Sequence, residues 1–226
     1  MRYTDVIPAV FISRPNRFIA EVEIGGEHQI CHVKNTGRCR ELLIPGTIVY
    51  LEKAKNSMRK TAWDLIAVQK GARLINMDAQ APNAVFGEWA RSGAFLPCTT
   101  GVRPEYVYGA SRLDFCIETA AGPHLVEVKG VTLERDGAAS FPDAPTERGV
   151  KHLRELQRAV TEGLAATLFF VVQMENIRSV SPNDKTHPAF GVALREAAAA
   201  GVRVLAYDCM VTPDSLSIHA PVPVIL

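Results

Sequence analysis

The pattern of apolar residues changes at Pro82, and this change divides the chain in two. Before Pro82, short runs in which apolar and polar residues alternate are typical of β-strands, and only Arg38 to Leu43 fits a helical turn. After Pro82, helical patterns alternate with apolar strands, an order typical of a sheet covered by helices. We therefore predict a two-domain α/β protein, with an all-β domain at residues 1–82 and a mixed-sheet α/β domain at residues 83–226.

The expected strands of the first domain follow the order of an OB-fold barrel. Three strands, a helical turn and two further strands make up that five-stranded fold. The strands are predicted near Ile7 to Ser13, Phe18 to Ile24, Glu27 to Lys34, Thr47 to Ala54 and Ala62 to Lys70, with a further run at Ala72 to Met77.

The second domain is predicted to mix helices and strands. A strand near Glu105 to Tyr108 precedes a hairpin from Ser111 to Thr132, whose turn is marked by Ala120 to Pro123. Helices are expected at Asn83 to Ser92, from the N-cap Thr146 to Glu162 and at Pro188 to Ala200, and strands at Leu168 to Gln173 and Val202 to Asp208.

Three polar residues of the hairpin form a pattern that suits metal-dependent hydrolysis. Glu127 and Lys129 share one strand face, and Asp114 on the first strand can meet Glu127 across the hairpin. Two carboxylates can hold Mg²⁺, which keeps several waters and often binds phosphate oxygens. A metal lowers the pKa of its water, and a lysine offsets charge on a phosphoryl oxygen. We therefore expect Asp114 and Glu127 to bind Mg²⁺ (or Mn²⁺) and Lys129 to assist the attacking water.

A second interpretation of the hairpin is a salt-bridged patch on an exposed sheet. Exposed ion pairs contribute only about 0 to 1 kcal/mol each. Two carboxylates about 4 Å apart, however, repel by roughly 4 kcal/mol at an effective dielectric near 20, and one lysine offsets only part of this repulsion. A bound cation would resolve the conflict. The hairpin by itself leaves both interpretations open.

Composition limits the class of protein. A chain of 226 residues with 47% hydrophobic and 22% charged residues is typical of globular proteins. The first thirty residues contain no signal-peptide run, and the apolar stretch Leu164 to Val172 is too short for a bilayer, so we expect a cytoplasmic protein. Five cysteines without a C-x-x-C pair argue against a disulfide framework and a structural zinc site.

The net charge of +1 hides an uneven distribution, with 12 Lys and Arg against 8 Asp and Glu up to Pro82, and 13 against 16 from Asn83 onward. OB barrels bind oligonucleotides on strands 2 and 3 and on the loops after strands 1 and 4. Basic residues occur at these places and beside a turn at Asn35 to Gly37, although solvated loops are commonly charged as well. The predicted nucleic-acid contacts are Arg14 and Arg17 in the first loop, Lys55, Arg59 and Lys60 in the loop Lys55 to Thr61, and His32, Lys34 and Asn35 at the end of strand 3.

The helix expected after Thr146 carries a further basic group. Its buried stripe runs from Val150 to Val160, and Arg148, Lys151 and His152 are expected on the opposite side in the first turns. The helix dipole favours an anion there, so we predict that these three residues position a DNA strand. The alternative is an ordinary solvated helix face.

Several segments together make the chain similar to a known family. They are NTGR at Asn35, SRLDF at Ser111, VEVKGVTL at Val126 and FPDAPTERGVKHL at Phe141. The chain resembles the sugar fermentation stimulation protein A (SfsA) family over nearly its whole length. That resemblance implies an N-terminal OB-like domain, a C-terminal domain of the PD-(D/E)xK nuclease fold, DNA binding and a link to sugar (maltose) metabolism.

The resemblance also assigns site residues. It places the aspartate of the nuclease pattern on Asp114 and its Glu-x-Lys on Glu127 and Lys129, with Leu113 where the pattern has proline. Some relatives of this fold add an upstream glutamate. Additional candidates for the site are therefore Glu88 and Glu105, together with Asp143 as a lining residue.

Two main functions follow from these expectations. The first is a DNA-binding, Mg²⁺-dependent nuclease, and intact carboxylates favour it because a purely binding domain gains nothing from negative charge that faces phosphate. The second is a non-enzymatic, largely sequence-nonspecific DNA-binding regulator that keeps the nuclease fold. A phosphodiesterase for a small nucleotide is a third. The sequence does not separate DNA from RNA, or single strands from duplexes.

Overall fold

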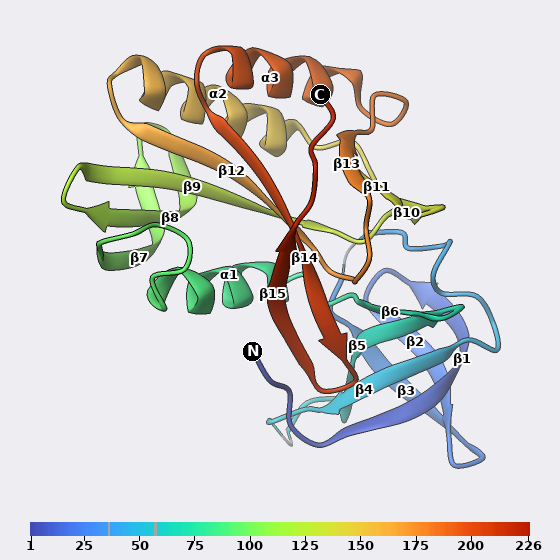
Figure 1. Cartoon of the computed structure of the whole chain (residues 1–226). Coiled ribbons are helices and arrows are strands. Elements are labelled where there is room, and N and C mark those ends of the chain that lie inside the picture. Colours follow the sequence, from blue (N-terminus) through green and yellow to red (C-terminus); the bar gives the residue numbers. More distant parts are fainter. Residues whose placement is uncertain (36, 57) are drawn as a thin grey trace.

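The computed structural model describes residues 1–35, 37–56 and 58–226. Two predicted features fall partly outside these residues, because the turn at Asn35 to Gly37 includes Thr36 and the loop Lys55 to Thr61 includes Ser57. The chain forms two domains, an N-terminal barrel and a C-terminal sheet with helices on both faces (Figure 1). No helix in the described part of the chain is long and apolar enough to cross a lipid bilayer.

The N-terminal domain is a closed five-stranded barrel with one added strand. Its strands are β1 (Val6–Asn16), β2 (Ile19–Ile24), β3 (Glu27–Val33), β4 (Ile48–Lys53), β5 (Trp63–Lys70) and β6 (Arg73–Asn76). The strand order is β3-β2-β1-β4-β5-β6, and a parallel pairing of His32 with Asp64 and Val33 with Leu65 joins β3 to β5. This pairing closes the barrel, so the predicted OB fold is confirmed.

The barrel core follows from alternation along the strands. Val22, Cys31 and Leu51 are each fully buried and point inward. The predicted helical turn between β3 and β4 is only a single turn, in which the backbone N–H of Leu43 donates to the carbonyl of Cys39 at 2.9 Å. It does not continue into a helix, because Pro45 follows and cannot donate a hydrogen bond.

The C-terminal domain is built on a six-stranded mixed sheet in the order β15-β14-β12-β9-β8-β7. The elements are α1 (Ala81–Arg91), β7 (Thr99–Tyr108), β8 (Ser111–Thr119), β9 (Gly122–Val131), α2 (Glu147–Thr161), β12 (Ala165–Val172), α3 (Pro188–Ala199), β14 (Arg203–Thr212) and β15 (Ser215–Pro221). Strand β12 lies parallel to both β9 and β14, and the other pairs are antiparallel. Helix α1 covers one face, and α2 and α3 cover the other (Figure 1).

A small second sheet was not predicted. It consists of β10 (Glu134–Arg135), β11 (Ala138–Phe141) and β13 (Ser179–Pro182), in the order β10-β11-β13. These strands of two to four residues are too short to show a period of two. The small sheet lies at the junction with the barrel, where Lys70 and Arg73 both pair with Glu134, at 2.7 and 2.8 Å.

Candidate functional site

Glu127 is the centre of the hairpin site. It lies on β9, on the face covered by α2, and its side chain is 2% exposed. Its Oε1 accepts hydrogen bonds from Lys129 Nζ at 2.5 Å and from His152 Nδ1. Its Oε2 is buried and has no hydrogen-bond partner among the described residues. A buried carboxylate oxygen without a partner is energetically unfavourable, so Oε2 is an open position for a ligand.

Asp114 joins β8 to β9 where their regular pairing ends. The last paired residues are Phe115 and Val126. Beyond them, Asp114 Oδ2 accepts the backbone N–H of Val128 at 2.8 Å, and Oδ1 accepts Nδ2 of Asn83 at 2.8 Å. Each oxygen of an ionised carboxylate has a second lone pair, so Asp114 can still bind a cation.

Asn83 is a site residue that sequence reasoning missed. It stands in the first turn of α1, which the pattern predicted only as the start of an amphipathic helix. No spacing rule connects it to Asp114, 31 residues later. The only signal in the sequence was its place directly after Pro82, because proline is common in the first turn of a helix.

The two carboxylates have different titration behaviour. Burial raises the pKa of Asp114, and the charge of Glu127 adds to this rise while Lys129 opposes it. Burial also opposes ionisation of Glu127, but the hydrogen bond from His152 and the charges of Lys129 and His152 outweigh it, so the pKa of Glu127 is lowered. A cation between the two groups would favour the ionised form of both.

Helix α2 reaches this site, but one prediction about its faces is wrong. His152 was expected on the solvent side, yet it is 4% exposed and contacts Glu127. It lies three residues after Gly149 and four before Leu156, which are both buried, and this helical spacing is the signal that was available in the sequence. A direct phosphate contact by His152 is not compatible with its burial.

Arg148 and Lys151 are exposed on α2, as predicted. Arg148 Nε donates to Nε2 of His152 at 3.4 Å, which leaves the proton of a neutral His152 on Nδ1, facing Glu127. Lys151 Nζ donates to the carbonyl of Ala110 at 2.8 Å. Both side chains therefore have a partner within the domain.

The additional acidic candidates lie apart from this cluster. Glu88 pairs with the N-terminal ammonium of Met1 at 2.7 Å, on the helix that covers the opposite face of the sheet. Glu105 is exposed and pairs with Arg112 at 3.5 Å. Both carboxylates are thus engaged elsewhere, and the structure does not bring them to Glu127.

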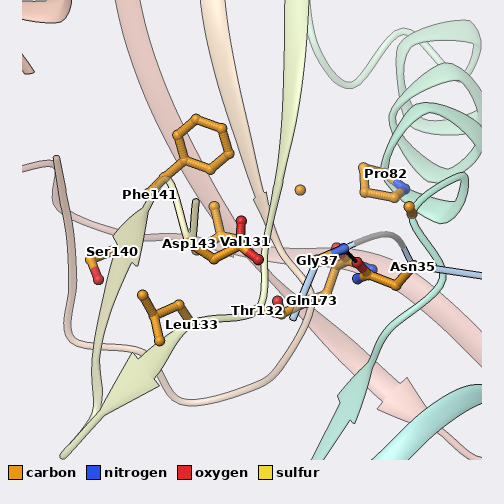
Figure 2. Close-up of a pocket in the computed structure, with 12 residues that line it drawn as sticks. Asn35, Gly37, Pro82, Val131, Thr132, Leu133, Ser140, Phe141, Asp143 and Gln173 are labelled. Carbon is orange, nitrogen blue, oxygen red and sulfur yellow. Dashed lines mark hydrogen bonds between the residues drawn. The ribbon is translucent and has the colours of Figure 1, made fainter. Parts of the chain in front are cut away.

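Asp143 lines a cavity of about 190 Å³ between the two domains. Figure 2 shows Asn35 and Gly37 of the barrel together with Asp143 and Phe141 around this cavity, and Asp143 Oδ2 lies 2.5 Å from the position that a Cβ on Gly37 would take. The cavity also reaches Gly130, which directly follows Lys129. The acidic side chain predicted to line the site is therefore at the domain junction.

Gly130 is needed for this junction to close. A Cβ at this position would lie 2.6 Å from Oε1 of Gln173 and 2.6 Å from Cγ of Pro82. No side chain fits such a space without a shift of its neighbours. The glycine after Lys129 therefore lets β9 pass between α1 and the end of β12.

The predicted contacts on the barrel fall into two groups. In the first group the charges are already neutralised. Arg59 donates to both oxygens of Asp64, at 2.7 and 2.9 Å, and His32 Nδ1 bonds to the same carboxylate at 2.9 Å. Burial opposes ionisation of Asp64, but these two partners hold its pKa below the ordinary value. Lys34 pairs with the buried Asp78 at 2.5 Å.

The side chains of Arg14 and Asn35 also form their hydrogen bonds within the protein. The Arg14 guanidinium donates to four backbone carbonyls at 2.7 or 2.8 Å, and Asn35 bonds to the carbonyl of Met77 at 3.0 Å and to the N–H of Gly37 at 2.7 Å. Arg17, Lys55 and Lys60 make up the second group and are exposed.

A groove of about 890 Å³ runs over this side of the barrel. Its lining includes Phe18, His32, Lys34, Asn35, Lys53, Lys55 and Arg59, together with the carboxylates of Glu52 and Asp64. Phe18 is 52% exposed, so its ring is accessible from the groove. An exposed aromatic ring beside basic residues is the arrangement on which bases of a single strand stack.

Within the described residues, no three His, Cys, Asp or Glu side chains gather into a metal site. The arrangement therefore does not fit zinc, which takes three or four protein ligands. Mg²⁺ takes one or two carboxylates and completes its shell with water and phosphate oxygens. Asp114 and the open Oε2 of Glu127 fit such a hard cation.

Family models match both domains of the chain. The model described as "SfsA N-terminal OB domain" matches residues 12–77, and the one described as "Sugar fermentation stimulation protein RE domain" matches residues 80–215. The chain belongs to the SfsA family. The resemblance that the sequence motifs indicated is therefore confirmed.

Curated SfsA relatives cover nearly the whole chain. A sugar fermentation stimulation protein homolog of Desulfitobacterium hafniense (strain Y51) is 56% identical over 216 residues, which are 96% of this chain and 94% of the relative. The homolog of Clostridium beijerinckii is 51% identical over 226 residues and covers 100% of both chains. The similarity to these relatives therefore extends over both domains.

A solved SfsA structure has the same fold. The structure of Pyrococcus furiosus SfsA in complex with Ca²⁺ is 28% identical in sequence and has a TM-score of 0.90, covering 100% of this chain and 98% of that chain. The arrangement of an OB barrel with a mixed α/β sheet is therefore shared across distant members of the SfsA family.

Proposed function

We propose that this protein is a DNA-binding phosphodiesterase that uses a divalent cation held by Asp114 and Glu127. The observation that carries the proposal is the buried Oε2 of Glu127, which has no partner in the described part of the chain and lies in a cluster with Lys129 and Asp114. The OB domain supports DNA binding, because such barrels bind oligonucleotides. The complex of the Pyrococcus furiosus relative with Ca²⁺, another oxygen-preferring cation, supports a metal.

Each residue of the site has a definite task in this function. Bound Mg²⁺ or Mn²⁺ would lower the pKa of a water and offset charge on the phosphoryl group. Lys129 Nζ, held by Glu127 Oε1, donates a hydrogen bond that orients the attacking water or a phosphoryl oxygen. Asn83 and His152 hold Asp114 and Glu127 in fixed positions. The exposed Arg148 and Lys151 attract the strand to the site.

One observation favours the competing function, a DNA-binding regulator that does not cut. Glu127 Oε1 already receives two donors, and one of them is the cationic Lys129, so much of its charge is offset without a metal. A site of this kind could persist as a structural feature of the domain. Cleavage assays separate the two functions.

The test uses purified protein with labelled single-stranded and duplex DNA, in Mg²⁺ or Mn²⁺. Glu127→Gln and Lys129→Met should cleave at least about 100-fold more slowly than wild type. Glu118→Gln, an exposed glutamate paired with Arg103, is the matched control and should cleave normally. If wild type cleaves no substrate with either metal, hydrolysis is excluded and the regulator remains.

Metal binding gives a readout that does not depend on cleavage. Calorimetric titration with Mn²⁺ should show one site in wild type and no site in Asp114→Asn. Equal binding by wild type and this variant would contradict the assignment of Asp114 as a ligand.

The exposed barrel cations are tested by salt dependence. Neutralising Arg17, Lys55 or Lys60 should lower the salt slope of single-strand binding by about 0.7 for each lost phosphate contact. Arg14 and Arg59 are paired within the barrel, so their replacement should act on stability first. Unchanged slopes for all three exposed residues would remove this surface from the proposal.

A further inference from the structure

Four arginines line a hollow at the edge of the domain junction. This hollow has a volume of about 490 Å³ and is lined by Arg14, Arg17, Arg38 and Arg40 of the barrel and by Ala144 in the segment that follows β11. No carboxylate is among the described residues that line it. The carboxylate of Asp143 lies beside Gly37 and offsets part of this positive charge, and a bound anion would offset the rest.

Arg14 holds together the two segments that line the hollow. One terminal nitrogen of its guanidinium group donates to the carbonyls of Arg17 and Asn35, and the other donates to the carbonyls of Gly37 and Arg38. These bonds tie the loop after β1 to the segment after β3. The backbone that carries Arg17 and Arg38 is therefore fixed before any ligand arrives.

Arg38 and Arg40 are presented to solvent by a strained residue between them. Both arginines are exposed, while Cys39 is 3% exposed and packs into the core. Cys39 has a φ of 46°, in the left-handed region that residues other than glycine rarely adopt. Such strain persists where the surrounding structure enforces it, often at binding sites. Here the strained Cys39 is buried while the arginines on either side of it are exposed.

The hollow and the two cavities described above are neighbours along the chain segment after β3. It shares Gly37 with the cavity of Figure 2, and that cavity shares Asn35 and Ala79 with the barrel groove. The same cavity reaches Gly130, next to Lys129. The groove, the cavity at β9 and the hollow of the four arginines therefore adjoin one another through Asn35, Gly37 and Ala79.

We infer that Arg17, Arg38 and Arg40 bind backbone phosphates of a single-stranded nucleic acid whose other part occupies the barrel groove. Arginine binds phosphate in a bidentate manner, which suits adjacent phosphates of one strand. The exposed Phe18 in the groove favours a nucleic acid over an acidic polypeptide, because bases stack on such a ring. The inference rests on the proposed nucleic-acid binding and does not depend on cleavage.

The test measures the effect of strand length. Fluorescent oligo-dT of about 4 to about 20 nucleotides is titrated with the full chain in EDTA, so that hydrolysis plays no part. The double variant Arg38→Gln/Arg40→Gln should bind the shortest strands like wild type and the longest strands about tenfold more weakly. Its salt slope for the longest strand should fall by about 1.4, for two lost phosphate contacts.

Two further variants serve as controls. Arg38→Lys/Arg40→Lys keeps the charge but not the bidentate geometry, so it should recover the salt slope and only part of the affinity. Arg203→Gln removes an exposed arginine at the start of β14 and should bind all lengths normally.

Several results would overturn the inference. One is equal binding of the longest strand by wild type and the double variant, and another is an equal loss at every length. If AMP or polyglutamate displaces the long strand as well as unlabelled oligo-dT does, the ligand is a small nucleotide or an acidic polypeptide instead. If wild type binds no strand, the proposed function fails as well.

Discussion

Asn76 and Gln173 are bonded to each other through both backbone and side chain. The N–H of Asn76 donates to the carbonyl of Gln173 at 2.9 Å, and Nε2 of Gln173 donates to Oδ1 of Asn76 at 2.9 Å. Asn76 ends β6 of the barrel and Gln173 follows β12 of the sheet, so the pair joins the two domains. Both side chains are buried, at 1% and 2% exposure.

Replacing Gln173 by leucine should destabilise the protein by about 1 to 3 kcal/mol, because it leaves buried polar groups of Asn76 and Asp78 with fewer partners. The free energy of unfolding in urea measures this loss. Gln69→Leu is the matched control, since Gln69 is half-buried and bonds to the nearby Gly71, and it should change stability by less than about 0.5 kcal/mol. Equal effects of the two substitutions would contradict the role of the pair.

His124 should make stability fall in mild acid. Burial lowers its pKa from 6.5 to about 4, and Arg203 adds to this shift. Below pH 6.5 the unfolded chain takes up a proton that the folded chain refuses until about pH 4, so stability is lost as pH falls through this window. From pH 7.5 to 5, wild type should lose about 2 kcal/mol more than His124→Gln. If the unfolding free energies of wild type and His124→Gln change equally with pH, His124 does not cause the loss of stability.

His152 is predicted to act as a positioning residue for Glu127. His152→Leu removes the Nδ1 donor and should slow metal-dependent cleavage about tenfold or more, because the Glu127 carboxylate is no longer fixed. His152→Asn keeps a donor near the same place and should restore part of the rate. His219→Leu, which removes a half-exposed histidine beside Asp208, is the control. A cleavage rate equal to wild type in His152→Leu would exclude this role.

Asp64→Asn should have opposite effects on stability and on nucleic-acid binding. The substitution removes the charge that holds Arg59 and His32, so the barrel should lose about 1 to 3 kcal/mol of unfolding free energy. The same change frees the Arg59 guanidinium in the groove. Affinity for single strands at low salt should therefore rise, with a salt slope steeper by about 0.7. Weaker binding by a folded Asp64→Asn would show that the pair itself shapes the groove.

The barrel and the hairpin were predictable because their signals are local. Apolar residues alternate from Phe18 to Ile24, and the turn at Ala120 to Pro123 fixes which residues of β8 and β9 face each other. The second strand of the last hairpin, β15, alternates in the same way at Leu216 and Ile218 and could have been predicted. The small sheet could not, because its strands are too short for alternation to appear.

Charge partners were the least predictable feature of the site. The sequence shows where arginines and lysines occur, but not that Asp64 neutralises a histidine 32 residues away or that Asp78 neutralises Lys34. His152 was misplaced for a related reason. His152 was predicted to face solvent because histidine is a polar residue. Its spacing from the buried residues of the helix and its hydrogen bond with Glu127, 25 residues earlier, place it in the interior.

The bonded junction at Asn76 and Gln173 also fixes how far the barrel groove lies from Lys129. A nucleic-acid strand that is bound by the barrel and reaches β9 then spans a constant distance between the groove and Lys129. Under the proposed function, a constant number of nucleotides would separate the segment bound by the barrel from the cleaved bond, whatever the base sequence. Cleavage of uniform single strands should therefore begin at one minimum length, whereas cleavage of the shortest strands that bind would mean that the two domains act independently.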